Sequence, residues 1–121
     1  MMEDDYNKVM IVEGLSDKKH IEKILDDNTI TIVCTNGTIG VEKLEELLEC
    51  YHLDDTEVFI LVDEDESGMK LRKQLAGELP HAEHIYVSSE FREVAATPKK
   101  KLASILAGKR IGIDLNYLAK W

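Results

Sequence analysis

The sequence of 121 residues carries 24 acidic and 15 basic side chains, which gives a formal net charge of −9. This length suits a single domain, and a hydrophobic content of 44% with two prolines excludes a disordered acidic chain and collagen. The longest apolar runs, residues 9–12 and 58–62, are too short to span a bilayer, and the acidic N-terminus is unlike a signal peptide, so we expect a cytoplasmic location.

The first elements alternate between strand and helix. Residues 8–12 are a short apolar run rich in β-branched side chains, which predicts a strand. After a break at Gly14, Ser16 and Asp17 are placed to cap a helix. Residues 29–34 predict a second strand. The helix between the two strands has apolar side chains at helical spacing: Ile21, Ile24 and Leu25.

The same unit then repeats along the chain. Residues 35–40 form a glycine-bearing loop, and residues 41–51 have the apolar spacing of a helix. Residues 58–62 are wholly apolar, as expected for a central strand that is covered on both faces. A third helix is expected after residues 63–68, and its apolar side is a row of leucines: Leu71, Leu75 and Leu79.

The last third of the sequence predicts one more strand and two helices. Residues 84–87 read as the fourth strand. Thr97 and Pro98 are typical of an N-cap and first helical position, and we expect this helix to reach about residue 107. Residues 114–121 are expected to form a short terminal helix.

Strands that alternate with helices of about ten residues predict parallel pairing, because each crossover helix returns the chain to the same edge of the sheet. The expected fold is therefore an α/β three-layer sandwich with a mainly parallel four-stranded sheet. Ligands bind beyond the carboxyl ends of the strands in such folds. The segments to examine are those that follow each apolar run: residues 13–14, 35–40, 63–68 and 88–89.

The negative charge is unevenly distributed. Residues 1–97 hold 9 basic and 23 acidic side chains, whereas residues 98–121 hold 6 basic side chains and one acidic residue, Asp114. We therefore expect a single domain over residues 1–121, in which residues 98–121 form a basic C-terminal helical extension. This extension would offer a face to a polyanion, although a solvated helix with lysines near its start explains the same pattern.

Carboxylates follow the first and third predicted strands. Glu13 comes directly after the first strand, and Asp63 and Asp65 come directly after the third. Crowding three carboxylates raises the cost of ionising all of them unless a cation neutralises them, and oxygen ligands at a partly open site suit Mg²⁺, with Mn²⁺ as a substitute. An Asp-x-Asp pair alone is also common in solvated acidic loops.

The histidines and cysteines do not compete for this role. The four histidines lack metal-ligand spacing and are expected at the surface or at strand ends. The two cysteines, Cys34 and Cys50, are too few for a disulfide framework and are expected to be buried, reduced thiols.

Three ordered motifs resemble those of a known family. The first strand ends Ile11-Val-Glu-Gly14, a Gly37-Thr38 loop follows the second, and the third ends Val62-Asp-Glu-Asp-Glu-Ser-Gly68. Over about residues 8–90 the sequence resembles the Toprim domain, the catalytic module of topoisomerases, bacterial primases, RecR-type recombination-repair proteins and the ribonuclease that matures small ribosomal RNA. The resemblance implies a Toprim, Rossmann-like sheet and a nucleic-acid partner, RNA or DNA.

The resemblance also implies roles for individual residues. Glu13 would be the catalytic acid or base and a third metal ligand, while Asp63 and Asp65 would hold the Mg²⁺. Asp17 would stabilise the start of the first helix. Residues implied to meet substrate or phosphate are the glycines and their neighbours at the strand ends, together with two basic side chains: Gly14, Gly37, Thr38, Gly68, Lys70 and Arg72.

The resemblance implies Mg²⁺-dependent phosphodiester processing by a small nuclease. The segment Asp63-x-Asp-x-x-Gly-x-x-x-Arg72 is similar to the ribosomal RNA maturation ribonuclease. A stand-alone Toprim of 121 residues is expected to lack the further domains of larger members, and the ordinary complement of four tyrosines disfavours topoisomerase action. A module that supplies a metal site or binds nucleic acid beside a partner protein, without catalysis, fits the same residues.

Two other classes of protein share parts of the pattern. A phosphoacceptor receiver domain has this length, this alternation and an Asp after the third strand, but it places an acidic pair after the first strand and a lysine after a fifth. A haloacid-dehalogenase-type phosphatase also uses Asp-x-Asp, but after its first strand, where this chain has Glu13.

Overall fold

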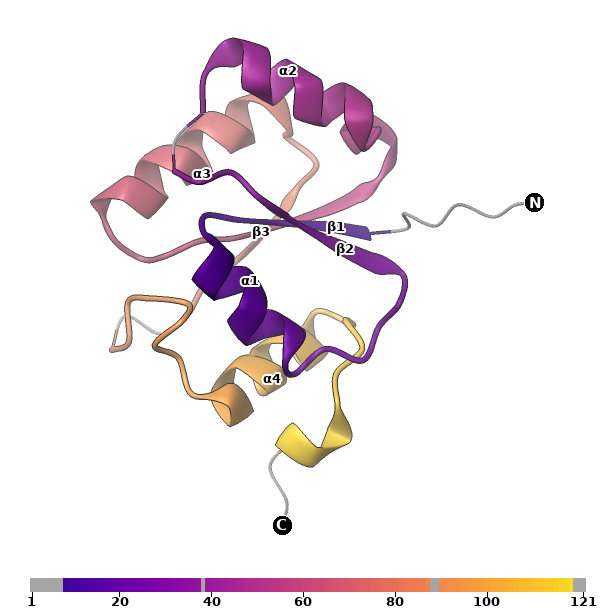
Figure 1. The fold of residues 1–121 in the computed structure, drawn as a ribbon, viewed down its shortest axis with the longest axis vertical. Coiled ribbons are helices and arrows are strands. Elements are labelled where there is room, and N and C mark those ends of the chain that lie inside the picture. Colours follow the sequence, from indigo (N-terminus) through magenta and orange to yellow (C-terminus); the bar gives the residue numbers. More distant parts are fainter. Residues whose placement is uncertain (1–7, 38, 88–89, 119–121) are drawn as a thin grey trace, which may run out of the picture.

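The centre of the fold is a four-stranded sheet in which every pair of neighbours is parallel (Figure 1). The computed structural model describes residues 8–37, 39–87 and 90–118. The strand order is β2-β1-β3-β4. The strands are β1 (Lys8–Val12), β2 (Ile30–Cys34), β3 (Glu57–Leu61) and β4 (Glu83–Ile85). The expected α/β fold with a parallel sheet is therefore confirmed.

Helices cover both faces of the sheet and make the three layers. In Figure 1, α2 and α3 lie on one face, and α1 and α4 lie on the other. The helices are α1 (Leu15–Glu22), α2 (Val41–Cys50), α3 (Glu66–Glu78) and α4 (Lys99–Gly108), with short 3₁₀ turns η1 (Leu53–Asp55) and η2 (Leu115–Tyr117). None of the helices in the described part of the chain has the length and apolar character that crossing a membrane would require.

The two central strands are apolar from their second residue onward because both of their faces are buried there. Met10 of β1 and Phe59 of β3 belong to the core cluster that also holds buried side chains of α1 and α4. Their neighbours Ile11 and Ile60 belong to the second cluster, which holds those of α2 and α3. This alternation follows from the two-residue period of a strand, and it explains the continuous apolar runs of the sequence.

Helix α4 is part of the first core. Its buried side chains Leu102, Ala103 and Leu106 lie in the cluster with Met10 and Phe59. The basic segment expected after residue 97 therefore turns one face to the sheet. The lysines at its start keep their charge near solvent, since Lys100 and Lys101 are exposed.

The segment after α4 is fastened to the loop that connects α1 to β2. Asp27 is the centre of this contact: its carboxylate accepts hydrogen bonds from the backbone N–H of Gly112 at 3.0 Å and of Thr29 at 2.9 Å, and it pairs with Lys8 at 3.1 Å. A Cβ atom on Gly112 would lie 2.6 Å from the carbonyl oxygen of Asp26, so only glycine fits there. These contacts hold both ends of the described chain together.

Two predicted helix caps are displaced, those of α1 and α4. Helix α1 is capped by Gly14 rather than by Ser16, and Asp17 accepts a hydrogen bond from the Gly14 N–H at 3.1 Å, which confirms that Asp17 stabilises this helix start. The N-cap of α4 is Pro98 rather than Thr97, whose hydroxyl donates to the carbonyl oxygen of Glu93 instead.

Two further features differ from expectation: the burial of the cysteines and the length of the terminal helix. Cys50 is exposed and Cys34 is half-buried, and both are free thiols, so neither is a fully buried core residue. The expected terminal helix is a single 3₁₀ turn, η2, after which the backbone of Leu118 is extended. Residues 119–121 of that expected helix lie outside the described residues.

Asp27 should make folding stability depend on acidity. Burial alone would raise the pKa of this carboxyl, but the hydrogen bonds from Thr29, Gly112 and Lys8 outweigh it and hold the pKa well below its usual range. A lowered pKa in the folded state stabilises the fold above about pH 4, and this contribution is lost as the pH falls further. We expect Asp27→Asn to lower the free energy of unfolding at pH 7 by about 2 kcal/mol and to weaken its decline in acid, measured by urea denaturation.

The matched control is Asp26→Asn, because the side chain of Asp26 is exposed. It should leave both the stability and its pH dependence close to those of the parent protein. An Asp27→Asn protein that loses stability in acid as steeply as the parent would show that Asp27 does not carry this dependence.

Candidate functional site

The fold brings Glu13, Asp63 and Asp65 together at the carboxyl edge of the sheet. One carboxylate oxygen from each residue lies within 4.8 Å of the other two. The register explains this meeting, because Ile11 lies opposite Ile60 in the parallel β1–β3 pair. When two neighbouring parallel strands end side by side, the residues that follow them lie close together at the carboxyl edge of the sheet.

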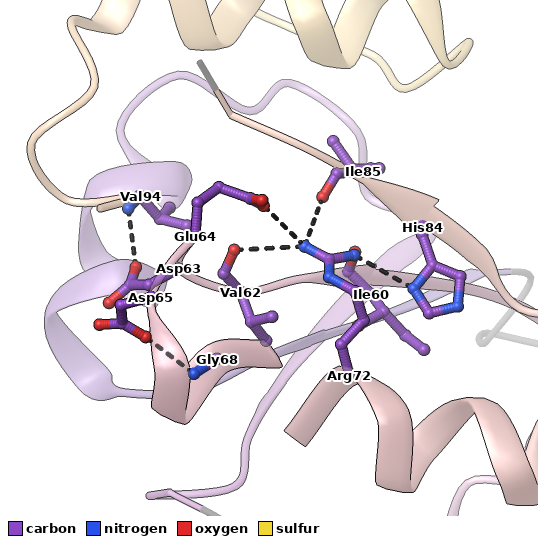
Figure 2. A network of polar contacts seen from close by, with 10 residues as sticks. All are labelled: Ile60, Val62, Asp63, Glu64, Asp65, Gly68, Arg72, His84, Ile85 and Val94. Atoms are coloured by element: carbon purple, nitrogen blue, oxygen red, sulfur yellow. Dashed lines mark hydrogen bonds and ion pairs between the residues drawn. The ribbon is translucent and has the colours of Figure 1, made fainter. Parts of the chain in front are cut away.

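Each of the three carboxylates is oriented by a hydrogen bond. Asp63 accepts from the backbone N–H of Val94 at 2.8 Å, and Asp65, the N-cap of α3, accepts from the Gly68 N–H at 2.8 Å (Figure 2). Glu13 Oε2 accepts from the hydroxyl of Ser67 at 2.9 Å. These described contacts engage one oxygen of each residue, which leaves the others to bind a ligand.

The remaining oxygen of Glu13 identifies the kind of ligand that suits the site. Within the described ranges, Glu13 Oε1 is a buried oxygen without a hydrogen-bond partner. Burying an unsatisfied polar atom costs about 1–3 kcal/mol, and more for a charged group. Three carboxylates offer the hard oxygen ligands that Mg²⁺ and Mn²⁺ prefer. The residues present therefore fit a divalent cation.

A fourth carboxylate adds to the negative charge beside this cluster. Asp17 is only 6% exposed. Burial raises the pKa of this carboxyl, the negative charges of Asp63 and then Glu13 raise it further, and hydrogen bonds from the backbone of Gly14 and Ala95 partly offset the rise. Sequence reasoning gave Asp17 only a helix-capping role. The available signal was its place in the first turn of α1, four residues after Glu13.

The glycines expected near the site have different roles. A Cβ atom on Gly68 would lie 2.0 Å from the carbonyl oxygen of Asp63, so the first turn of α3 can pack on this loop only through glycine. Gly37 has a φ of 104°, in the left-handed region that favours glycine. A Cβ on Gly14 would make an ordinary contact of 3.6 Å with Asp17.

The loop after β2 lies beside the acidic cluster. The backbone N–H of Asn36 donates to the carbonyl oxygen of Glu13, and that of Thr35 donates to the carbonyl oxygen of Val12 at 3.0 Å. The loop that contains Gly37 is therefore anchored to the end of β1. Thr38, the other residue implied there, lies outside the described residues.

Arg72 has partners that the sequence did not indicate. Its side chain is buried, with 8% of the residue exposed. The guanidinium donates to the carbonyl oxygens of Ile60, Val62 and Ile85 and pairs with the Glu64 carboxylate at 3.1 Å (Figure 2). Arg72 thus joins α3 to the ends of β3 and β4. These contacts engage the donors that phosphate would require, so Arg72 is not proposed as a phosphate ligand.

Lys70, the other basic residue implied to meet phosphate, is exposed on α3. It lines a hollow together with Asp65 and Arg92. Arg92 belongs to the segment between β4 and α4, to which sequence reasoning gave no role. This segment reaches the site through two backbone contacts, from Val94 N–H to Asp63 and from Glu64 N–H to the carbonyl oxygen of Arg92 at 2.5 Å.

Comparison with known families gives the same assignment. The Toprim domain family matches residues 8–89 of this chain. The chain belongs to the Toprim family. A Toprim assignment agrees with an Asp-x-Asp pair after β3 and a Glu-Gly pair after β1, and it is favoured over the receiver and haloacid-dehalogenase alternatives, which require other residues after the first strand.

Relatives extend the family match over almost the whole chain. The solved structure of a small TOPRIM domain protein from Bacillus stearothermophilus is 42% identical, with a TM-score of 0.87 and 98% of each chain covered. The uncharacterized protein YusF of Bacillus subtilis (strain 168) is 47% identical over 120 residues, which are 99% of this chain and 80% of YusF. Similarity to small Toprim proteins therefore includes α4 and the segment that follows it.

A weaker similarity joins the chain to a ribonuclease. Ribonuclease M5 1 of Ligilactobacillus salivarius (strain UCC118) is 30% identical over 81 residues. The match covers 67% of this chain but only 42% of the ribonuclease. Family membership and this similarity support a nucleic-acid-related, nuclease-like function in coarse terms.

Gly68 should be more sensitive to substitution than its position on a helix suggests. A methyl group at residue 68 would overlap the Asp63 backbone, so Gly68→Ala must displace the loop that holds Asp63 and Asp65. We expect the free energy of unfolding, measured by urea denaturation, to fall by about 2 kcal/mol or more, because the loop backbone must move to avoid the added methyl group.

Gly77→Ala is the control in the same helix, since nothing lies within 4 Å of a Cβ added there. It should stabilise the protein by up to about 1 kcal/mol, the usual effect of replacing an exposed helical glycine. Equal stability changes in the two variants would show that the close contact at Gly68 is not a constraint.

The carboxylate cluster should bind Mg²⁺ or Mn²⁺ in the folded state. Saturating metal should then raise the melting temperature, because a ligand at ~100 times its Kd stabilises the folded state by about 2.7 kcal/mol. Replacing both aspartates, Asp63→Asn with Asp65→Asn, should abolish the increase in a thermal-shift measurement, since it removes two of the three ligands.

The double variant Asp54→Asn with Asp55→Asn removes the same number of charges from the exposed turn η1, which precedes β3 and lies at its opposite end. This control should keep the metal-dependent increase. A metal shift that survives replacement of Asp63 and Asp65 would show that the cation binds elsewhere.

Proposed function

We propose that this Toprim protein is a small Mg²⁺-dependent nuclease, most simply a ribonuclease, that cleaves phosphodiester bonds of nucleic acid at the Glu13–Asp63–Asp65 cluster. The observation that carries the proposal is the meeting of these three carboxylates within 4.8 Å, with the buried oxygen of Glu13 left unpartnered. The similarity to ribonuclease M5 supports this choice of substrate class.

The residues of the cluster divide the chemistry between them. A bound divalent cation would polarise the phosphoryl oxygens and offset the charge of the carboxylates. Asp63 and Asp65 would hold that cation, each already oriented by a backbone N–H. Ser67 fixes Glu13 through Oε2, so Oε1 is the atom that faces the site, and Glu13 has two proposed roles there, as a third ligand of the cation and as the group that exchanges a proton.

Glu13 then acts as the general base or acid of the cleavage. In hydrolysis, Glu13 accepts the proton that the attacking water loses as its oxygen bonds to phosphorus. The phosphorus–oxygen bond opposite to the water breaks, and the leaving oxygen takes up a proton. A positioned general base contributes typically ~10²–10⁴-fold to such a step.

Basic side chains around the cluster would position the anionic substrate. Lys70 lines the hollow next to Asp65, and we assign phosphate binding to it. We also propose that residues 1–121 act as one domain whose segment 98–121 offers lysines to the substrate. The segment that leads into α4 contacts the cluster, because the backbone N–H of Val94 donates to Asp63.

The thiols of the chain support a cytoplasmic location for the proposed nuclease. Both cysteines are free, and Cys50 is exposed. Exposed free thiols are usual in reducing compartments, which supports a cytoplasmic location.

One observation favours a second candidate function. The chain spans 42% of the ribonuclease that it resembles, so that protein has a further part which this sequence does not match. A module that binds metal and nucleic acid without catalysis, beside a partner protein, would use the same residues.

The proposed activity is tested by incubating the purified chain with structured RNA, single-stranded DNA and supercoiled DNA in Mg²⁺ or Mn²⁺. We expect cleavage of RNA, and a loss of about 10²-fold or more in Glu13→Gln, because the amide cannot accept the proton. Gel analysis of the products measures the rate. Glu22→Gln, on the exposed part of α1, is the matched control and should retain the parent rate.

The outcomes separate the two candidates. Cleavage that persists at the parent rate in Glu13→Gln would show that the active site lies elsewhere or that a contaminant acts. Metal-dependent binding without cleavage of any of the three substrates would overturn the nuclease and favour the binding module.

A further inference from the structure

A groove leads away from the carboxylate cluster along α3 towards β4. It consists of two adjoining hollows of about 470 and 400 Å³. Asp65 lies in the first, Tyr86 lies in the second, and both hollows are lined by Glu64, Met69 and Lys73. Because these three residues are shared, the groove is continuous from a proposed metal ligand to an aromatic side chain.

Tyr86 is the aromatic side chain at the far end of the groove. It is 57% exposed, directly after edge strand β4. The guanidinium carbon of Arg72 lies 4.2 Å from the centre of its ring, and the ring of His84 lies 6.3 Å away at an angle of 23°. The ring is therefore supported by buried Arg72 and still keeps more than half of its surface accessible.

Met69, an apolar residue that lines the groove, is exposed to solvent as Tyr86 is. Met69 is 62% exposed, although a large apolar side chain on α3 would be more stable in the core. Met69 and Tyr86 line the same hollow, so the two form one accessible apolar surface next to the carboxylate cluster. A flexible thioether beside an aromatic ring is a surface suited to a flat apolar ligand.

Basic side chains line the groove between this surface and the cluster. Lys70, Lys73 and Arg92 are all exposed. Three acidic side chains accompany them: Glu64, which pairs with Arg72 at 3.1 Å, the proposed metal ligand Asp65, and Glu66, which is exposed. The three exposed basic side chains therefore outnumber the two acidic ones without an ion pair, and a cation held by Asp65 would increase this excess, which complements a polyanion.

We infer that this groove binds a single-stranded stretch of nucleic acid, with one unpaired base stacked on Tyr86 against Met69 and its phosphates directed by Lys73, Lys70 and Arg92 to the carboxylate cluster. The inference rests on the proposed function and deepens it by naming the form of the substrate. Base–aromatic stacking needs an accessible base face, which a duplex does not offer. Tyr86 therefore selects unpaired nucleotides beside the bond that is cut.

The inference is tested by binding, without cleavage. A fluorescein-labelled uridine homopolymer is titrated with protein in Ca²⁺ buffer and followed by fluorescence anisotropy, while a gel confirms that the oligonucleotide stays intact. We expect Tyr86→Ala to weaken binding by about 5- to 150-fold, the range that corresponds to the loss of one stacked base. Tyr86→Phe keeps the ring and should bind within about twofold of the parent protein.

Three controls make the result specific. Leu115→Ala removes an exposed side chain of η2, at 72% exposure, and should leave the affinity unchanged. Lys73→Ala should weaken binding and reduce the salt dependence, with a slope of log K against log salt that is smaller by about 0.7. A uridine–adenosine duplex should compete less well than the single strand.

Two results would overturn the inference: unchanged affinity in Tyr86→Ala, or equal competition by the duplex. If Tyr86→Ala instead changes the sedimenting mass and not the affinity, the surface is a contact between copies of the chain, which also overturns it. Failure of the nuclease is distinguishable, because the chain would then bind single strands through Tyr86 but cleave none of the substrates. If Tyr86→Ala cleaves as fast as the parent protein, the role of Tyr86 is overturned and the proposed nuclease activity is not.

Discussion

The parallel pairing of β1 with β3 is the constraint on which the rest of the molecule depends. Each of these strands is buried on both faces, so their register is fixed by two cores at once. A slip of one residue would turn every side chain of a strand to the other face. The register that buries the apolar side chains of both cores also places the ends of β1 and β3 side by side. It therefore brings Glu13 close to Asp63.

Holding like charges together requires donors from elsewhere in the chain. The backbone N–H groups of Gly68 and Val94 supply them to Asp65 and Asp63. Arg72 contributes indirectly, since it binds the carbonyl oxygens at the ends of β3 and β4 and neutralises Glu64 next to the cluster. The loop after β3 is thereby held by contacts that do not depend on a ligand, and such preorganisation lowers the cost of binding one.

The sequence predicts the parts of this structure that depend on local patterns. Apolar runs locate the four strands, and the carboxylates that follow them indicate the site, because strand ends of a parallel sheet meet at one edge. The start of α1 was misplaced because Ser16 is a stronger capping residue than Gly14, and the choice between them depends on where Asp17 can reach back.

Other features depend on contacts between distant residues, which a single sequence does not reveal. An arginine that follows a glycine loop looks like a phosphate ligand, but Arg72 finds its partners in carbonyl groups of two strands. The exposure of Tyr86 is equally non-local, because it results from β4 being the last strand of the sheet. No sequence pattern connected Val94 to Asp63 across 31 positions.

The hydrogen bond from Val94 to Asp63 extends the proposed site beyond the residues that the Toprim family match covers. The Toprim family match stops at residue 89, before the residue that orients one of the proposed metal ligands. The chain continues from Val94 through the hydroxyl contact of Thr97 with Glu93 into α4, which is anchored in the core by Leu102 and Leu106. Helix α4, on the sheet face that α1 also covers, is thus connected to the site, and the segment that orients Asp63 lies beyond the residues that the family match covers.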